Sequence, residues 1–338
     1  MQRSFNGAAL MSLAALAAAG AYASSPTAPG YQPPRQSDGR PSLEGTWTNA
    51  TLTSLQRPAR YQQLVIPPNE IEAATNSHPQ VVRQRTDDAS AEQSANTALD
   101  GNDLRSGRGY NAFWIDPGMS YASVKGEYRT SFIVDPPDGQ IPLRAEVRNA
   151  RGEGRNSFDG PEARPLGERC IINSGSAGPP MMTYLYNNNY EIVQTGDAVA
   201  IRAEMNNYAR VVRIGGKHIP ASIRQFHGDS IGRWEGDTLV IETTNFHALH
   251  ANTNLGLSST AKVTERLTRY SDTQILYEFT VEDPTRYERP WRGEMSFNAT
   301  KGPVYEYACH EGNYALEGTL RGAREEEKRA VQGNRTAE

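Results

Sequence analysis

The chain has 338 residues, of which 37% are hydrophobic and 22% are charged, and its formal net charge is −4 at pH 7. Its lysines and arginines are scattered rather than gathered into a stripe, which argues against the basic surface of a nucleic-acid-binding protein. Apart from the N-terminus, no stretch approaches the roughly 18 consecutive apolar residues that a spanning helix needs, so we expect no membrane span.

The N-terminus predicts export. Arg3 supplies a positive charge, residues 8–19 are almost wholly apolar, and an Ala-Tyr-Ala motif ends at Ala23. These are the three parts of a signal peptide, which we place at residues 1–23. The mature protein is therefore expected to be periplasmic or secreted. Residues 24–40, rich in Pro, Ser and Gln, are predicted to be a disordered tether.

The sequence contains two cysteines, Cys170 and Cys309. Exported chains meet an oxidising compartment, so we predict that these two form a structural disulfide. A bridge across so long a loop stabilises a fold by about 4–5 kcal/mol in the chain-entropy model when it is unstrained. A catalytic thiol and a two-cysteine metal site are the less favoured alternatives.

Residues 41–338 are predicted to form a single β-rich domain whose N-terminal part is rich in loops. A first strand at 43–48 contains Gly45-x-Trp47, a pattern typical of the start of lipocalin-type barrels. Residues 88–104 are polar and are predicted to be a loop. Further segments with strand composition are separated by short turns, and they lie at 128–134, 190–194, 198–205, 209–214, 221–226, 232–234, 239–246, 261–270, 274–282, 290–297 and 303–308.

The connections between most of these strands are too short to hold helices, so neighbouring strands are expected to pair antiparallel. Eight or more such strands avoid open edges by closing into a barrel or by packing as two sheets. The predicted fold is therefore mainly β, an antiparallel meander that closes into a lipocalin-like barrel or forms two packed sheets. Residues 314–332 are rich in Ala, Leu, Glu, Arg and Lys and predict a C-terminal helix laid against the sheet.

The stretch from residue 224 to 246, RQFHGDSIGRWEGDTLVIETTNF, carries the densest set of polar groups on predicted strands. Gly236 and Asp237 between two strand-like runs indicate a hairpin, because Gly tolerates positive φ and Asp bonds to its own backbone. Strands with so many polar groups either face water or line a polar cavity. Under the second interpretation, Trp234 and Asn245 are candidate substrate-binding residues.

Glu265 is the first candidate catalytic residue. On the strand at 261–270, alternation places Glu265 on the same face as the apolar Val263 and Leu267. A carboxylate that faces a dry interior has a raised pKa and can act as a general acid or base. Arg210 shares a face with apolar residues of its own strand, so it is the natural partner for this carboxylate or for an anionic substrate. The alternative is a purely structural ion pair.

His227 and Asp229 are the other candidate catalytic residues. An imidazole beside a carboxylate is the pairing that a general base needs, because the carboxylate selects the tautomer and stabilises the cation. A structural role is the competing interpretation. His310 follows Cys309 directly, so a disulfide would hold it in place as a candidate substrate-binding residue.

His247 and His250 have the i,i+3 spacing of a helical metal site, but catalytic zinc takes three protein ligands and the spacing is common by chance. We therefore predict no metal. The one Gly-x-Ser-x-Gly match, residues 228–232, lies on a predicted hairpin and not in the strand–helix setting of an elbow. The sequence also lacks a Walker loop, a His-Glu-x-x-His motif and a dinucleotide fingerprint, and we expect no cofactor. Gly-Asp-Ser at 228–230 lies on a hairpin without the strand–helix setting of serine esterases, so we reject that class.

Three long motifs carry a resemblance. They are Gly-Thr-Trp-Thr-Asn at 45–49, Gly-Asp-Ser-Ile-Gly-Arg-Trp-Glu-Gly-Asp-Thr-Leu-Val at 228–240 and Tyr-Glu-Tyr-Ala-Cys-His-Glu-Gly-Asn-Tyr at 305–314. The chain resembles a group of exported, β-rich bacterial proteins that share these motifs and have no assigned reaction. The resemblance implies export. Members of the group often carry histidine where this chain has Asn207 and Lys262, which implies a different activity here if those histidines are functional.

Taken together, the sequence favours a periplasmic, cofactor-independent acid–base enzyme of the lyase or isomerase type. Proton transfer alone can drive such reactions. Sixteen tyrosines and four tryptophans suit a pocket for a small aromatic or otherwise apolar substrate. The first alternative is a lipocalin-like protein that binds a small ligand without turning it over. The second is a carbohydrate-directed hydrolase.

Overall fold

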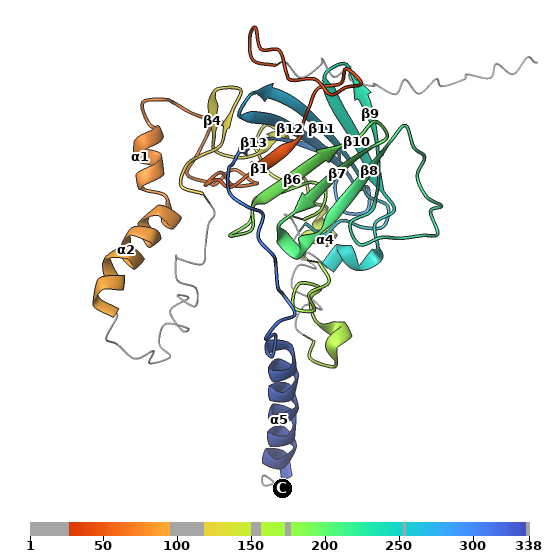
Figure 1. Ribbon diagram of the computed structural model, residues 1–338. Helices are drawn as coiled ribbons and strands as arrows, with labels where there is room; N and C mark the ends of the chain where they lie inside the picture. The colour runs from red at the N-terminus through yellow and green to blue at the C-terminus, as the bar shows by residue number, and fades with distance from the viewer. Residues whose placement is uncertain (1–26, 95–117, 150–156, 173–176, 253–254, 336–338) are drawn as a thin grey trace, which may run out of the picture.

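The computed structural model describes residues 27–94, 118–149, 157–172, 177–252 and 255–335. Ten strands form one sheet, and all of them except β5 (Ile133–Asp135) close into a barrel (Figure 1). β1 closes the ring, because it pairs with β6 on one side and with β13 on the other. In barrel order the strands are β1 (Gly45–Thr48), β6 (Asn189–Gln194), β7 (Ala198–Ala203), β8 (Ala209–Ile214), β9 (Asp229–Glu235), β10 (Thr238–Thr244), β11 (Lys262–Ser271), β12 (Gln274–Glu282) and β13 (Trp291–Ala299). The predicted mainly β barrel is confirmed.

One strand pair departs from the predicted antiparallel meander. β8 and β9 are parallel, with Arg213 opposite Ile231. Residues 221–226 were expected to supply an intervening strand, but they form only an isolated bridge between Gln225 and Phe246. The chain from 215 to 228 therefore returns along the barrel without pairing as a strand, and β9 starts in the same direction as β8.

A small lobe flanks the barrel. Its sheet contains β2 (Val65–Ile66), β4 (Glu127–Arg129) and β3 (Ser123–Val124), and helices α1 (Ile71–Asn76) and α2 (Pro79–Ser94) lie to its side (Figure 1). α2 includes residues 88–94 of the loop predicted at 88–104, so the loop prediction is wrong for these residues. Pro79 provides a favourable first helical residue, and the Ala, Glu and Gln residues that follow are good helix formers. The rest of the predicted loop lies outside the described residues.

The barrel interior is packed with side chains. Alternate residues of each strand point inward, and large buried members of this core are Trp47, Tyr190, Tyr277, Phe279, Trp291 and Phe297. Residues 177–182 are all buried and join the same core, where the backbone N–H of Met181 donates to the Tyr277 hydroxyl over 2.9 Å. We call residues 177–182 the plug.

Trp47 has the place that its pattern predicts. It is buried on β1, and its indole N–H donates to the carbonyl of Leu43 over 3.0 Å. The guanidinium of Arg269 lies 4.6 Å from the centre of the Trp47 ring, a cation–π contact. Arg269 also donates to the carbonyls of Ser42, Ser271 and Asp272, so it fastens the entry of β1 to the end of β11.

The two ends of the described chain differ from their predictions. The tether predicted at 24–40 is described from residue 27, and there it is attached to the barrel: Arg35 pairs with Asp237 through two hydrogen bonds of 2.7 and 3.0 Å. The C-terminal helix α5 (Ala315–Arg335) is confirmed, but it projects away from the barrel instead of lying against the sheet (Figure 1). Its charged side chains pair along the helix itself, as Arg321 does with Glu317, so most of its surface meets water.

The remaining short helices are α4 (Ala145–Asn149), η2 (Pro161–Ala163), η3 (Met205–Asn207) and η4 (Ala248–Asn252). None of the helices in the described residues is long and apolar enough to cross a membrane. The predicted signal peptide at 1–23 lies outside the described residues.

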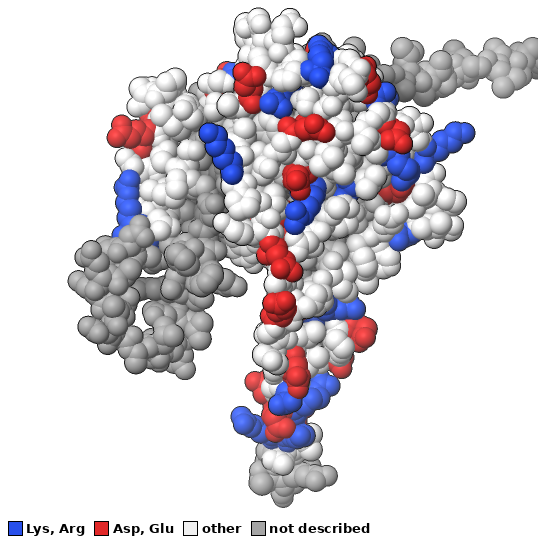
Figure 2. Space-filling model, viewed as in Figure 1, with Lys and Arg blue, Asp and Glu red and all other residues white. Residues whose placement is uncertain are grey.

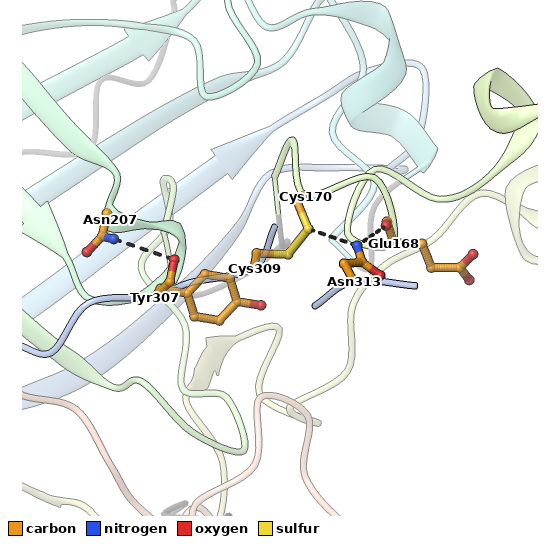
Figure 3. Close-up of a disulfide and its surroundings, with 6 residues drawn as sticks. All are labelled: Glu168, Cys170, Asn207, Tyr307, Cys309 and Asn313. Carbon is orange, nitrogen blue, oxygen red and sulfur yellow. Dashed lines mark hydrogen bonds between the residues drawn. A yellow bond between two sulfur atoms is a disulfide. The ribbon is translucent and has the colours of Figure 1, made fainter. Parts of the chain in front are cut away.

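The predicted disulfide is confirmed. Cys170 and Cys309 are bonded, with their Cα atoms 5.7 Å apart and a sequence separation of 139. Figure 3 shows that the bridge joins the segment after η2 to the chain that runs from β13 to α5. Asn313 follows the bridge and donates to Cys170 Sγ over 3.3 Å and to the Glu168 carbonyl over 3.4 Å.

Candidate functional site

Arg210 and Glu265 meet in the barrel interior, as the sequence predicts. Both terminal nitrogens of Arg210 donate to the two carboxylate oxygens, and the Nη2–Oε1 distance is 3.0 Å. The Tyr277 hydroxyl donates to the same Oε1 over 2.8 Å. Burial opposes the charge of Arg210, but Glu265 outweighs it, so the pKa of Arg210 lies above its ordinary value. Burial, reinforced by Glu265, also raises the pKa of Tyr277, which therefore stays a donor.

The plug covers this network. Besides bonding to the Tyr277 hydroxyl, Met181 accepts a hydrogen bond at its carbonyl from the side-chain amide of Asn49 over 3.2 Å. The side chains of Arg210 and Glu265 are 3% and 0% exposed. A carboxylate that is fully bonded and shielded from solvent fits a structural ion pair, which is the alternative that the sequence left open.

His227 is buried next to the plug, before β9 begins. Its ring centre lies 4.0 Å from that of Tyr208, and a Cβ on Gly178 would lie only 2.1 Å from its Nδ1. Burial, with smaller contributions from His250 and Arg210, lowers the pKa of His227 to about 3, so its imidazole is neutral at pH 7. Within the described part of the chain, Nδ1 has no hydrogen-bond partner.

Asp229 faces away from His227, so the predicted catalytic pair does not form. Its carboxylate lies on the outer side of the barrel, where it accepts two hydrogen bonds from Arg213 and lies 2.8 Å from Nδ1 of His218. Burial opposes the ionisation of Asp229, but these hydrogen bonds and one from the Ile219 backbone outweigh it and lower its pKa. The physical reason is Gly228, whose φ of +74° turns the chain between the two side chains.

The three other predicted binding residues are separated. Trp234 is half-buried and packs against the barrel core from β9. Asn245 directly follows β10 with φ +59° and donates to the carbonyl of Ile219 over 2.9 Å, which is a turn contact. His310 is exposed beside the disulfide. Thus, among the predicted catalytic and substrate-binding residues, only Glu265 and Arg210 bond to each other.

His247 and His250 do not converge on one point. The ring of His247 packs against Phe226 at 4.8 Å, whereas that of His250 packs against Phe246 at 5.4 Å. Burial lowers the pKa of His250 to about 4. Among the described residues, no group of three or more His, Cys, Asp or Glu side chains is placed to hold a metal ion.

A pocket lies between the barrel end and the small lobe, and we call it the lobe cleft. Its volume is about 390 Å³, within the range of small-molecule pockets. Residues 51–55 and 182–185 line it, together with His78 and Gln80 from the helical lobe, and apolar side chains complete it, namely Phe132, Ile141 and Leu255. The hydroxyls of Thr51 and Thr53 are bonded to backbone carbonyls, so the polar groups of this lining are largely satisfied.

Besides Tyr184, the lobe cleft contains one further titratable side chain among its lining residues, His78. The backbone N–H of Gln80 donates to its Nδ1 over 3.2 Å, and the ring packs edge-on against Tyr121. Burial and the nearby Arg60 lower the pKa of His78, so the ring is neutral at pH 7. Because Nδ1 accepts a hydrogen bond, the proton of the neutral ring sits on Nε2, which can donate to a ligand.

The sequence did not reveal the lobe cleft, because its walls come from three distant stretches. One local signal existed: His78 precedes Pro79, and a polar residue before proline often starts a helix. The face of the molecule in Figure 2 carries charges of both signs, interspersed and without a large patch of either. This surface does not suggest a strongly charged ligand.

No protein-family model matches the chain, and no curated protein is similar enough to count as a relative.

Proposed function

We propose that the protein binds a small, largely apolar molecule with one hydrogen-bond acceptor in the lobe cleft. The observation that carries this proposal is the pairing of an apolar cavity of about 390 Å³ with His78 in its lining, a neutral ring whose Nδ1 accepts from Gln80 and whose proton is therefore on Nε2. Small-molecule sites typically combine such an apolar lining with a few polar groups that orient the ligand. This is the ligand-binding alternative, with the ligand beside the barrel rather than inside it.

We also propose that the protein is exported, as its N-terminal sequence predicts. The disulfide is compatible with an oxidising compartment. Membership of the group of exported bacterial proteins with the same three motifs stays a prediction.

Acid–base catalysis of the lyase or isomerase type is the second candidate function. It is supported by the neutral His227, whose Nδ1 has no partner among the described residues. A substrate would reach Glu265 only if the plug left the barrel end. Under this hypothesis, Glu265→Gln and His227→Ala abolish turnover of a substrate and leave the melting temperature unchanged.

Two naphthalenes test the binding proposal. 2-Acetylnaphthalene has a carbonyl acceptor, whereas 2-ethylnaphthalene has the same ring and a similar volume but no acceptor. We expect calorimetric titration to detect both and to give tighter binding for the ketone. A single neutral hydrogen bond contributes about 0.5–1.5 kcal/mol, so the ratio should be about 2- to 13-fold.

Two substitutions locate the site. His78→Phe keeps an aromatic ring without the donor, so it should remove the preference for the ketone. Leu185→Trp adds bulk to the lining of the cleft and should weaken both ligands at least tenfold, whereas Val211→Trp, on an exposed side chain outside the cleft, should change neither. The proposal is overturned if neither naphthalene binds or if Leu185→Trp binds both as the parent does.

A further inference from the structure

A second, larger hollow lies where the chain leaves the barrel. Residues 303–314, which we call the strap, connect β13 to α5 without regular structure except turns. Between the strap, the first turns of α5 and the segments around 164–168 and 186–187 is a groove of about 1080 Å³. Its wall contains the disulfide of Figure 3. We propose that this groove binds a neutral oligosaccharide.

Aromatic rings line the groove. Tyr186, Tyr305 and Tyr307 all contribute to its surface, and Tyr305 remains 65% exposed. A tyrosine ring has an apolar face and a polar tip, so it can pack against the C–H face of a sugar ring while its hydroxyl stays hydrated. Several such rings along one groove suit a chain of sugars better than a single small molecule.

The polar groups of the groove suit a neutral partner and disfavour an anionic one, because Glu306 also lines the groove and is exposed. Arg164 donates two hydrogen bonds of 2.9 Å to Glu168, so these charges neutralise each other. Glu204 is buried and accepts from the Asn189 side chain over 2.7 Å and from the backbone N–H of Tyr305 over 3.2 Å. The remaining lining includes the amides of Asn187 and Asn313 and the hydroxyl of Thr319, which are donors and acceptors suited to sugar hydroxyls.

These same contacts favour binding over hydrolysis. A glycosidase needs two carboxyl groups that are available to the scissile bond as acid and base. Here Glu168 is engaged by Arg164 at both oxygens, and Glu204 is engaged at both of its own. These two carboxylates therefore have no unbonded oxygen that an acid or base would use. Glu306, which also lines the groove and is exposed, supplies only one of the two carboxyl groups that a glycosidase needs.

The groove is also preorganised. The Cys170–Cys309 bridge fixes the middle of the strap, and the bond from Tyr305 to Glu204 fixes its start. A surface that is already held in its binding conformation loses less entropy when it binds. Reduction of the bridge should free the strap and weaken binding, while the barrel stays folded.

Chitotetraose, cellotetraose and maltotetraose are the probes for calorimetric titration of the oxidised, full-length protein. We expect at least one of them to bind, and Tyr305→Ala to lower that affinity at least tenfold. Tyr314→Ala is the matched control, because Tyr314 is exposed on the same strap but does not line the groove. Dithiothreitol should lower the affinity at least threefold while the near-ultraviolet circular dichroism of the barrel aromatics is retained.

Three results would overturn the proposal. The first is that none of the three tetrasaccharides binds. The second is that Tyr305→Ala and Tyr314→Ala have equal effects. The third is that a proline-rich decapeptide, the other partner that tyrosine-lined grooves accept, binds while the sugars do not. Neither naphthalene titration bears on these outcomes, because the lobe cleft and the groove share no lining residue.

Discussion

Arg210 and Glu265 form an ion pair across the barrel, although their strands, β8 and β11, are not neighbours in the sheet. β9 and β10 lie between them. The pair therefore connects opposite walls of the barrel through its interior, and Tyr277 on β12 extends the connection to a third strand and the plug. Strand pairing places Glu265 and Tyr277 on neighbouring strands, but it does not bring Arg210 to them.

Removing one partner of this pair should destabilise the fold strongly. Glu265→Gln leaves Arg210 charged in a site without solvent, and breaking a buried pair in this way costs about 3–5 kcal/mol. We expect urea unfolding, followed by tryptophan fluorescence, to show a loss of this size. An unchanged free energy of unfolding with loss of a measured turnover would instead favour the catalytic hypothesis.

A double variant separates the charge from the packing. Arg210→Met combined with Glu265→Leu removes both charges and keeps apolar volume, so we expect it to be more stable than Glu265→Gln alone. If the double variant is less stable than Glu265→Gln, the ion pair itself stabilises the fold, and the loss in Glu265→Gln is not only the cost of leaving Arg210 buried without its partner.

The buried histidines should make the protein sensitive to acid. The pKa of His227 is lowered from 6.5 to about 3, and that of His250 from 6.5 to about 4. Below pH 6.5 the two histidines bind protons in the unfolded chain but not in the folded chain. The stability that the neutral, buried histidines contribute is therefore fully present above pH 6.5 and is lost as the pH falls toward their pKa values in the folded protein. Each contributes a slope of about 1.4 kcal/mol per pH unit in that window.

Urea unfolding at pH 7, 6, 5 and 4 measures this slope. At pH 7, His227→Gln should unfold at a lower urea concentration than the parent. Its free energy of unfolding should then decrease less steeply than that of the parent between pH 7 and pH 4. His310→Gln is the control, because His310 is exposed, and it should follow the parent at every pH. A parent whose stability is flat between pH 7 and pH 4 would contradict the lowered pKa values.

Much of the fold was predictable because the information was local. Strand alternation placed Glu265 and Arg210 on inward faces, and turn residues located most strands of the barrel. The cysteines and the export signal together predicted the bridge. Local information failed where the chain changes direction. His227 and Asp229 are neighbours in sequence, but Gly228 turns them toward different sides of the barrel.

The lobe cleft and the groove were not predictable from the sequence for a related reason. Their walls combine segments that are far apart in the chain, such as 51–55 with 182–185, and no periodic pattern links such segments. The direction of α5 was missed because its composition predicts a helix but does not say what the helix packs against. Its charge pairs allow it to remain in water.

The contact between Trp47 and Arg269 should be measurable. Arg269→Lys loses the planar fork that donates to three carbonyls and stacks on the indole, so we expect the free energy of unfolding to fall by about 1–2 kcal/mol. Arg233→Lys is the control, since Arg233 is exposed and its pairing with Glu235 is a surface contact that contributes about 0–1 kcal/mol. Equal losses in the two variants would show that the guanidinium fork of Arg269 contributes no more than a surface ion pair does.

Gly178 provides the sharpest test of the plug. A Cβ at this position would lie 2.1 Å from Nδ1 and 3.0 Å from Cε1 of the buried His227, and neither ring nor plug has solvent to move into. Gly178→Ala should therefore cost about 1–3 kcal/mol, the usual range for overpacking a core. Gly196→Ala is the matched control, because a Cβ at the exposed Gly196 meets nothing within 4 Å. A tolerated alanine at 178 would mean that the plug is not packed against the ring of His227, and the barrel end would then be open to a substrate approaching Glu265.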